Sequence, residues 1–171
     1  MKKNSIIFGL IAGIVVSIPM LIITSNCTFD FEKGMLIGYS SMLIAFSLVF
    51  VGIKNYRDKF NQGTINFGKA FKIGSIIVLI ASTIYVVSWL INYFYFIPDF
   101  AEKYSEHMIN NLKQEGASAI EIEAKTKEMI EFSKMYKNPL INALITYTEI
   151  LPVGLLVTLV SAIILKRKNN S

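Results

Sequence analysis

The sequence predicts an all-α membrane protein with four transmembrane helices and an extracytoplasmic αα-hairpin between the third and the fourth. Hydrophobic residues make up 53% of the 171 residues and charged residues only 17%, and the mean hydropathy of +0.51 is high for a soluble domain. Four apolar runs approach or exceed the roughly 20 residues that a helix needs to cross a bilayer. With one exception, the charged residues lie outside these runs, which argues against a soluble enzyme and predicts a single membrane domain over 1–171.

The four runs extend over about 6–25, 35–53, 73–96 and 140–165. As helices that rise about 1.5 Å per residue they span roughly 30 to 40 Å, so the longer two must tilt or protrude into the interface. None of them shows the alternation of apolar and polar residues that is typical of barrel strands, so each is expected to cross as a helix.

The N-terminal segment has some features of a signal peptide, since Lys2 and Lys3 precede an apolar stretch. That stretch, 6–23, is longer than the roughly 7 to 15 residues of a typical signal-peptide core, and no small-x-small cleavage pattern follows it. Cys27 suggests a lipoprotein, but Asn26 stands where processing sites carry a small residue. We therefore expect the first helix to be retained.

The basic residues predict the orientation. The N-terminus, the 54–72 connection and the C-terminal end together carry ten Lys or Arg and one acid, whereas the opposite side carries seven lysines and ten acids. The positive-inside rule then predicts a multi-pass protein of the bacterial cytoplasmic (inner) membrane with both termini cytoplasmic. Basic clusters that flank membrane helices contact anionic lipid, so the pI of about 9.2 does not indicate nucleic acid.

The connection before the third run contains a helix start. Asn66 is a candidate N-cap, and Phe67 and Phe71 lie one turn apart on the same face of the helix that it would begin. With Lys69 and Lys72 nearby, this segment is expected to be an interfacial anchor.

The segment 98–138 is long enough to fold by itself. Gly116 is expected to end one helix, and Ser118 with Glu121 forms a capping box that begins a second, which predicts the αα-hairpin. Its simplest geometry is a stalk that continues the third and fourth runs outward. His107 is expected to be solvated on its surface, because no second metal ligand lies beside it.

Glu149 is the one acidic residue inside a predicted crossing, about nine residues and roughly 14 Å into the fourth run. Pro152 leaves the carbonyl of Thr148 without its helical donor, so a free acceptor is expected nearby. One interpretation is a proton- or cation-responsive polar site; the other is a neutral Glu that packs the bundle through a hydrogen bond. We favour the packing role. The candidate hydrogen-bond partners on the third run are Ser82, Ser88 and Asn92.

Two pairs of glycines have the spacing that lets helix backbones approach closely, namely Gly9 with Gly13 and Gly34 with Gly38. Such faces pack within a bundle or between copies, and packing within the chain is the default. Polar aromatic residues and one amide near the end of the third run are typical of an interfacial belt. They are Trp89, Asn92, Tyr93 and Tyr95.

Catalytic patterns are missing from the sequence. It has no Gly-rich phosphate loop, and its one His and one Cys exclude the usual catalytic triads, His-rich metal sites and Cys cages. No internal repeat of the kind found in transporters is present. We therefore expect no enzyme activity, no metal and no cofactor.

Four segments carry a resemblance to a known family: 30–39, 50–58, 67–74 and 149–154. Together they resemble the bacterial domain-of-unknown-function family DUF4199, over nearly the whole chain. The resemblance implies a small helical membrane protein with the same four crossings and implies no activity for any residue.

The leading hypothesis is a non-enzymatic component of the membrane whose hairpin or helix faces dock an unidentified membrane protein or a second copy. The alternative is a homo-oligomeric proton or cation pathway that uses Glu149. Beyond the lipid bilayer and these possible partners, no nucleic acid is expected.

Overall fold

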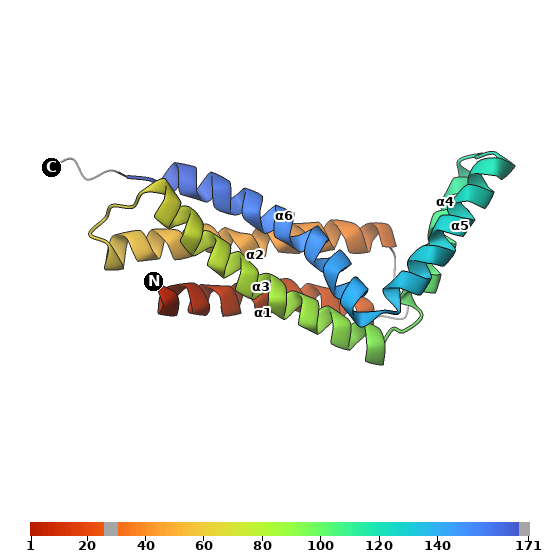
Figure 1. Ribbon diagram of the computed structural model, residues 1–171, viewed down its shortest axis with the longest axis horizontal. Coiled ribbons are helices and arrows are strands. Elements are labelled where there is room, and N and C mark those ends of the chain that lie inside the picture. The colour runs from red at the N-terminus through yellow and green to blue at the C-terminus, as the bar shows by residue number, and fades with distance from the viewer. Residues whose placement is uncertain (26–30, 168–171) are drawn as a thin grey trace.

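The computed structural model describes residues 1–25 and 31–167, so Asn26 and Cys27 of the sequence interpretation lie outside the described residues. The described chain forms six α-helices and no strand. They are α1 (Lys2–Ser25), α2 (Phe31–Phe60), α3 (Phe67–Tyr95), α4 (Phe100–Gln114), α5 (Ala119–Tyr136) and α6 (Pro139–Leu165). Helices α1, α2, α3 and α6 are long and apolar enough to cross a membrane. They form the bundle, and α4 and α5 form a hairpin at one end of it (Figure 1).

The helices extend beyond the apolar runs that predicted them. Helix α2 covers Phe31–Phe60 where the run was 35–53, and α3 begins at Phe67 rather than at residue 73. Hydrophobicity marks the part of a helix that lipid covers, whereas caps mark its ends. The predicted cap is confirmed, because the side-chain oxygen of Asn66 accepts the backbone N–H of Lys69 at 2.8 Å.

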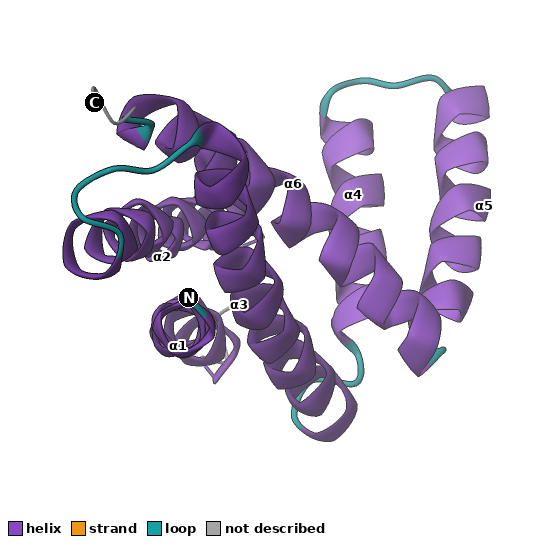
Figure 2. Ribbon diagram, turned by 60° about the vertical axis from the view of Figure 1, so that its left-hand side comes forward, coloured by secondary structure: helices purple, strands orange, loops and turns teal. Residues whose placement is uncertain are grey.

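Helix α3 lies at the centre of the bundle and packs mainly against α1 and α6. Helices α1 and α2 run side by side, while α3 and α6 cross them at an angle (Figure 2). Two glycines permit close contact between α3 and α6. A Cβ atom added to Gly74 would lie 2.5 Å from Cγ2 of Thr158, and one added to Gly154 would lie 2.5 Å from Cγ1 of Val78.

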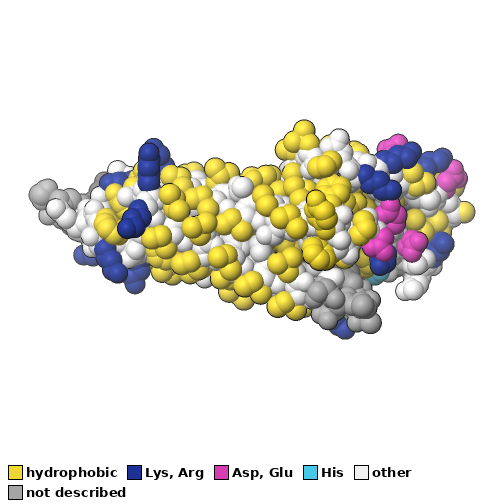
Figure 3. All heavy atoms as spheres, turned by 90° about the horizontal axis from the view of Figure 1, so that it is seen from below, with side chains coloured by type: hydrophobic (Ala, Val, Ile, Leu, Met, Phe, Trp, Pro, Cys, Tyr) yellow, Lys and Arg dark blue, Asp and Glu magenta, His cyan; other side chains and the backbone are white. Residues whose placement is uncertain are grey.

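The surface of the bundle is apolar between two charged ends (Figure 3). Leu36, Ile44 and Leu156 on its outer faces are more than 60% exposed. Large apolar side chains in such numbers on the outside of a bundle are typical of lipid contact. The structure thus agrees with a multi-pass membrane protein.

At the end of the bundle that carries both termini, here called the termini end, backbone hydrogen bonds join distant parts of the chain. The N–H of Ile65 donates to the carbonyl of Arg167 at 3.0 Å, and the N–H of Arg167 donates to the carbonyl of Ile65 at 2.8 Å. Asn4 donates its side-chain N–H to the carbonyl of Gly52 at 2.9 Å. These bonds fix α1, α2, α6 and the 61–66 loop to one another.

The hairpin helices form as predicted. The capping box of Ser118 and Glu121 is present, and Gly116 has a φ of +79°, a conformation that glycine adopts without steric cost. The two helices meet through small residues, with the hydroxyls of Ser105 and Ser133 3.0 Å apart.

The expectation of a straight stalk is wrong. The chain leaves helical geometry between α3 and α4 and again between α5 and α6, and the hairpin departs at an angle to α3 and α6 (Figure 1). Its base packs on the bundle through rings: the centroids of Trp89 and Phe100 lie 5.0 Å apart, and those of Tyr93 and Tyr136 lie 5.3 Å apart. We call this end of the bundle the hairpin end.

His107 is also placed differently from the prediction. Its ring stacks on Phe31 with centroids 5.0 Å apart, and Nε2 lies 3.1 Å from the side-chain nitrogen of Asn111. The histidine therefore helps to hold the start of α2 against the hairpin rather than facing solvent alone.

Candidate functional site

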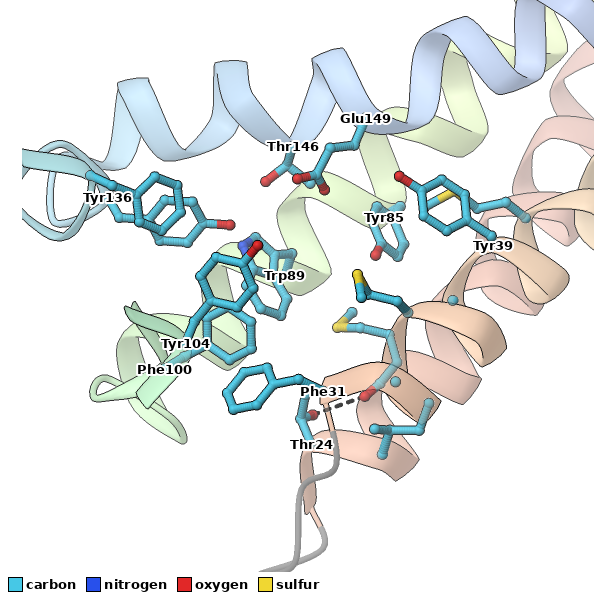
Figure 4. A pocket seen from close by; sticks show the side chains of 17 residues that line it. Thr24, Phe31, Tyr39, Tyr85, Trp89, Phe100, Tyr104, Tyr136, Thr146 and Glu149 are labelled. Carbon is cyan, nitrogen blue, oxygen red and sulfur yellow. Dashed lines mark hydrogen bonds between the residues drawn. The ribbon is translucent and has the colours of Figure 1, made fainter. Parts of the chain in front are cut away.

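A cavity of about 330 Å³ lies at the hairpin end, between the hairpin base and the diverging bundle helices (Figure 4). Its walls contain residues from all six helices. We call it the hairpin pocket. Eight of its lining residues are aromatic: Phe31, Tyr39, Tyr85, Trp89, Phe100, Tyr104, Phe132 and Tyr136. The remaining ones are mainly Met, Gly and Thr, together with one carboxylate, Glu149.

The rings on the hairpin side pack against one another as a continuous wall. The centroid of Phe31 lies 5.7 Å from that of Phe100 and 5.6 Å from that of Tyr104. Tyr104 in turn lies 5.8 Å from Phe132. Aromatic pairs at these separations attract one another beyond the effect of area burial, so α2, α4 and α5 are held together around the pocket.

Hydrogen bonds below the rings fix α3 and α6. The indole N–H of Trp89 donates to the side-chain oxygen of Asn142 at 3.0 Å, and the side-chain N–H of Asn142 donates to the carbonyl of Tyr136 at 3.1 Å. The hydroxyl of Thr146 donates to the carbonyl of Asn142 at 2.9 Å. Because Asn142 is fully buried, this network orients the indole firmly.

Glu149 extends from α6 toward the space between Trp89, Tyr85 and Tyr39 (Figure 4). The residue is exposed and belongs to the lining of the pocket. Among the described residues no hydrogen bond and no ion pair reaches its carboxylate, although many of its neighbours are paired. A carboxylate in a membrane-spanning segment is costly unless it meets a partner, so this position is unusual.

The hydrogen bond predicted between Glu149 and the third helix is not formed. Asn92 donates instead to the hydroxyl of Thr24 on α1 at 2.7 Å, and the buried hydroxyl of Ser82 has no partner within the described chain. The amide of Asn92 is thus engaged by α1 rather than by Glu149. Pro152 follows Glu149 by one turn of α6, and neither Pro152 nor Asn92 is among the residues that line the pocket around Glu149.

The two glycine pairs lie in different surroundings. A Cβ on Gly9 would lie 2.8 Å from Cβ of Ile80, and one on Gly13 would lie 2.8 Å from Cβ of Ile84, so this pair brings α1 and α3 together within the chain. Gly34 and Gly38 line the hairpin pocket, and a Cβ on Gly38 would meet nothing within 4 Å. Gly38 thus widens the pocket instead of packing a helix.

The pocket has a negative rather than a positive electrostatic character. No Lys, Arg or His lines it. Burial raises the pKa of the Tyr136 phenol, and the charge of Glu149 raises that pKa further, so the phenol stays protonated at neutral pH. Across the described residues, no group of three His, Cys, Asp or Glu side chains could hold a metal ion.

The family model described as "Protein of unknown function (DUF4199)" matches residues 4–167, nearly the whole chain. The chain belongs to this family. No curated protein and no solved structure matches it. Every residue that lines the hairpin pocket lies within the matched range, so the pocket is part of the DUF4199 fold of this chain.

Sequence reasoning missed the hairpin pocket of this DUF4199 protein. The sequence predicts Trp89 and Tyr93 in an interfacial belt, but they are only 7% and 1% exposed, whereas Tyr95 is 80% exposed. The available signal was the density of aromatic residues at the ends of separate segments, which recurs from Phe31 to Tyr136. This density predicts a pocket only once the segments are known to meet at one end of the bundle.

Proposed function

We propose that this DUF4199 protein is a non-enzymatic, multi-pass protein of the bacterial cytoplasmic membrane whose hairpin pocket binds a small amphiphilic ligand. The observation that carries the proposal is the pocket itself, about 330 Å³ in volume and lined mainly by rings and methionines. Pockets of roughly 300 to 1,000 Å³ with apolar walls and a few polar groups are typical of ligand sites.

The distribution of charge supports the placement of this pocket on the outer side of the membrane. Basic residues gather at the termini end, whereas the hairpin carries both signs (Figure 3). By the positive-inside rule the termini end is cytoplasmic and the hairpin faces outward. A ligand would then arrive from the extracytoplasmic side or from the outer part of the bilayer.

A homo-oligomeric proton or cation pathway through Glu149 receives less support. The carboxylate lines a pocket that the helices of its own chain form, so no second copy is needed to build its surroundings. Between this pocket and the termini end, the bundle is filled by fully buried side chains such as Phe46, Val49 and Ile77. This packing leaves no continuous polar route along the described bundle.

A second candidate function is the docking of another membrane protein on the hairpin. Two large apolar side chains favour it: Ile120 is 81% exposed and Ile130 is 51% exposed, on the part of the chain that extends beyond the bundle. Crosslinking in native membranes from Ile120 and Ile130 would test it, and the absence of any protein adduct would contradict it.

The binding proposal is tested with the intrinsic fluorescence of Trp89. This is the only tryptophan of the chain, it lines the pocket, and it is shielded from the lipid. Protein in lipid nanodiscs is titrated with 12-bromododecanol, a neutral amphiphile whose bromine quenches nearby indoles. Saturable quenching is expected, because only a molecule within the pocket comes close to the ring.

The matched variants are Gly38→Leu and Ser40→Leu on the same helix. Leucine at 38 extends into open pocket space, whereas residue 40 is exposed and does not line the pocket. Quenching should weaken in Gly38→Leu and persist in Ser40→Leu. Linear quenching that is equal in all three proteins would overturn the proposal.

A further inference from the structure

The carboxylate of Glu149 lies in the hairpin pocket. It belongs to the eleventh residue of α6, about 15 Å along the helix from Pro139, within a segment apolar enough to span the membrane. Several acidic side chains of the hairpin have partners, such as Glu102, whose carboxylate accepts from Lys137 at 2.9 Å. Glu149 has no such partner among the described residues, and its side chain points into a cavity (Figure 4).

The cations of the described chain are placed where they do not neutralise Glu149. None of them lines the hairpin pocket. On the hairpin, Lys103 pairs with Asp99 at 2.6 Å, and Lys125 and Lys127 pair with glutamates of their own helix. The carboxylate is therefore available to a cation from outside the chain.

The other walls of the pocket also favour positive charge. Aromatic faces carry negative potential and attract a cation that lies within about 6 Å of the ring centre. Tyr39, Tyr85 and Trp89 surround Glu149 in the pocket (Figure 4), and the ring of Phe100 meets Trp89 edge-on at 84°. Tryptophan is the strongest ring for this interaction.

We infer that the hairpin pocket recognises an alkylammonium group, an organic cation with apolar substituents on nitrogen, through the carboxylate of Glu149 and the rings of Tyr39, Tyr85 and Trp89. This inference rests on the proposed ligand-binding function and names the chemical class of the ligand. The carboxylate neutralises the charge, and the rings contact the substituents that a hydrated metal ion lacks.

Other ligand classes fit this chemistry less well. An anion would meet one carboxylate and no basic side chain. A divalent metal ion prefers several oxygen ligands, and no cluster of three acidic or other metal-ligating residues exists among the described residues. A neutral apolar molecule would contact the rings but leave the carboxylate of Glu149 without a partner. A charge without a partner is unfavourable in a site of low polarity.

The test compares benzyltrimethylammonium with neopentylbenzene, in which carbon replaces the charged nitrogen. Binding is followed by Trp89 emission in phosphatidylglycerol nanodiscs, for the wild type, Glu149→Gln and Glu115→Gln. Residue 115 is an exposed acid at the hairpin tip, so its variant removes the same charge far from the pocket. Glu149→Gln should weaken the affinity for the cation by about tenfold or more, since one partner of a shielded charge pair is lost. It should leave the neutral compound within about twofold, whereas Glu115→Gln should alter neither affinity.

Replacing one of the aromatic rings tests the inference independently of Glu149. Tyr39 lines the pocket and is 52% exposed, so Tyr39→Leu removes a π face at little cost to packing. Its affinity for the cation should fall several-fold, and that for neopentylbenzene should not. If both compounds bind the wild type equally and Glu149→Gln changes neither affinity, the cation inference is overturned while ligand binding stands.

If neither compound binds and bromododecanol fails to quench Trp89 as well, the proposed function itself is overturned. The source of the ammonium group is separated by repeating the titration in phosphatidylcholine nanodiscs. Nanodiscs of a neutral galactolipid serve as the reference, because the negative surface of phosphatidylglycerol itself concentrates the cation. A weaker apparent affinity in phosphatidylcholine than in the galactolipid identifies a competing lipid headgroup, whereas equal affinities identify a free ligand. Either result supports the alkylammonium class.

Discussion

Trp89 donates its indole N–H to the side-chain oxygen of Asn142 across 3.0 Å, and this bond joins α3 to α6 beneath the hairpin pocket. The same amide donates to the carbonyl of Tyr136, at the end of the hairpin. One buried side chain thus connects two helices that are apolar enough to cross a membrane with the hairpin. Its loss should affect both the stability of the bundle and the orientation of the pocket.

We therefore expect Asn142→Leu to destabilise the protein by about 1–3 kcal/mol, because a buried indole N–H and a buried carbonyl lose their partners. Thermal unfolding in detergent measures the loss, and Trp89 emission should change with it. Asn110→Leu on the exposed surface of α4 serves as the control. Equal unfolding temperatures for both variants would show that the network contributes little.

Alanine should have opposite effects on stability in the two glycine pairs. In Gly13→Ala the new Cβ would lie 2.8 Å from Cβ of Ile84, so overpacking should cost about 1–3 kcal/mol. In Gly38→Ala the Cβ would meet nothing, and the higher helix propensity of alanine should leave stability unchanged or raise it by up to about 1 kcal/mol. Chemical unfolding of the two variants in one detergent compares them. A stable Gly13→Ala protein with an altered oligomeric state would instead place this face between copies.

Acid should loosen the base of the hairpin. The hydrogen bond from Lys137 lowers the pKa of Glu102, and that from Lys103 lowers the pKa of Asp99. Because the folded-state pKa values lie below the ordinary 4.5 and 3.8, this stabilisation is complete above about pH 4.5 and is lost as the pH falls through the lowered values. Trp89 emission reports the change, since its ring packs on Phe100 at the hairpin base.

The control for the acid response is Glu102→Gln, which removes the carboxyl that joins the start of α4 to Lys137 after α5. In this variant the pH-dependent part of the emission change should be smaller, because one of the titrating groups is gone. An acid transition of unchanged size in the variant would assign the response to other groups.

Topology is predicted by the charge distribution and checked by cysteine labelling. In a chain whose Cys27 is replaced by serine, Gln114→Cys at the hairpin should react with an impermeant maleimide added to intact cells. Lys59→Cys near the end of α2 should react only after the membrane is opened, because the positive-inside rule places it in the cytoplasm. Both native residues are exposed, so burial does not limit either reaction. The reverse pattern would invert the proposed orientation.

The helices and their caps were accessible from sequence because both depend on neighbours in the chain. Apolar length predicted the four long helices, and the oxygens of Asn66 and Ser118 predicted the starts of α3 and α5. The end of α2 at Phe60 was not predicted, because the apolar run stops at residue 53. The polar residues that follow continue the same backbone hydrogen bonds, so hydrophobicity does not mark this end.

The pocket was not accessible because the bundle helices are apolar all round. In such a helix the period of the sequence does not distinguish the side that faces lipid from the side that faces protein. Trp89 and Tyr95 therefore looked equivalent, although one is buried and the other is 80% exposed. Likewise Asn92 seemed available to Glu149, and only the crossing of α3 with α1 shows that its amide bonds to Thr24.

The paired backbone bonds between Ile65 and Arg167 close one end of the bundle, whereas the other end diverges around a cavity. The two leaflets of a bilayer therefore meet different objects. One leaflet surrounds closely packed helices that backbone hydrogen bonds join, and the other surrounds helices with a cavity between them. In such an arrangement, lateral pressure would bear on packed side chains in one leaflet and on helices that enclose a cavity in the other.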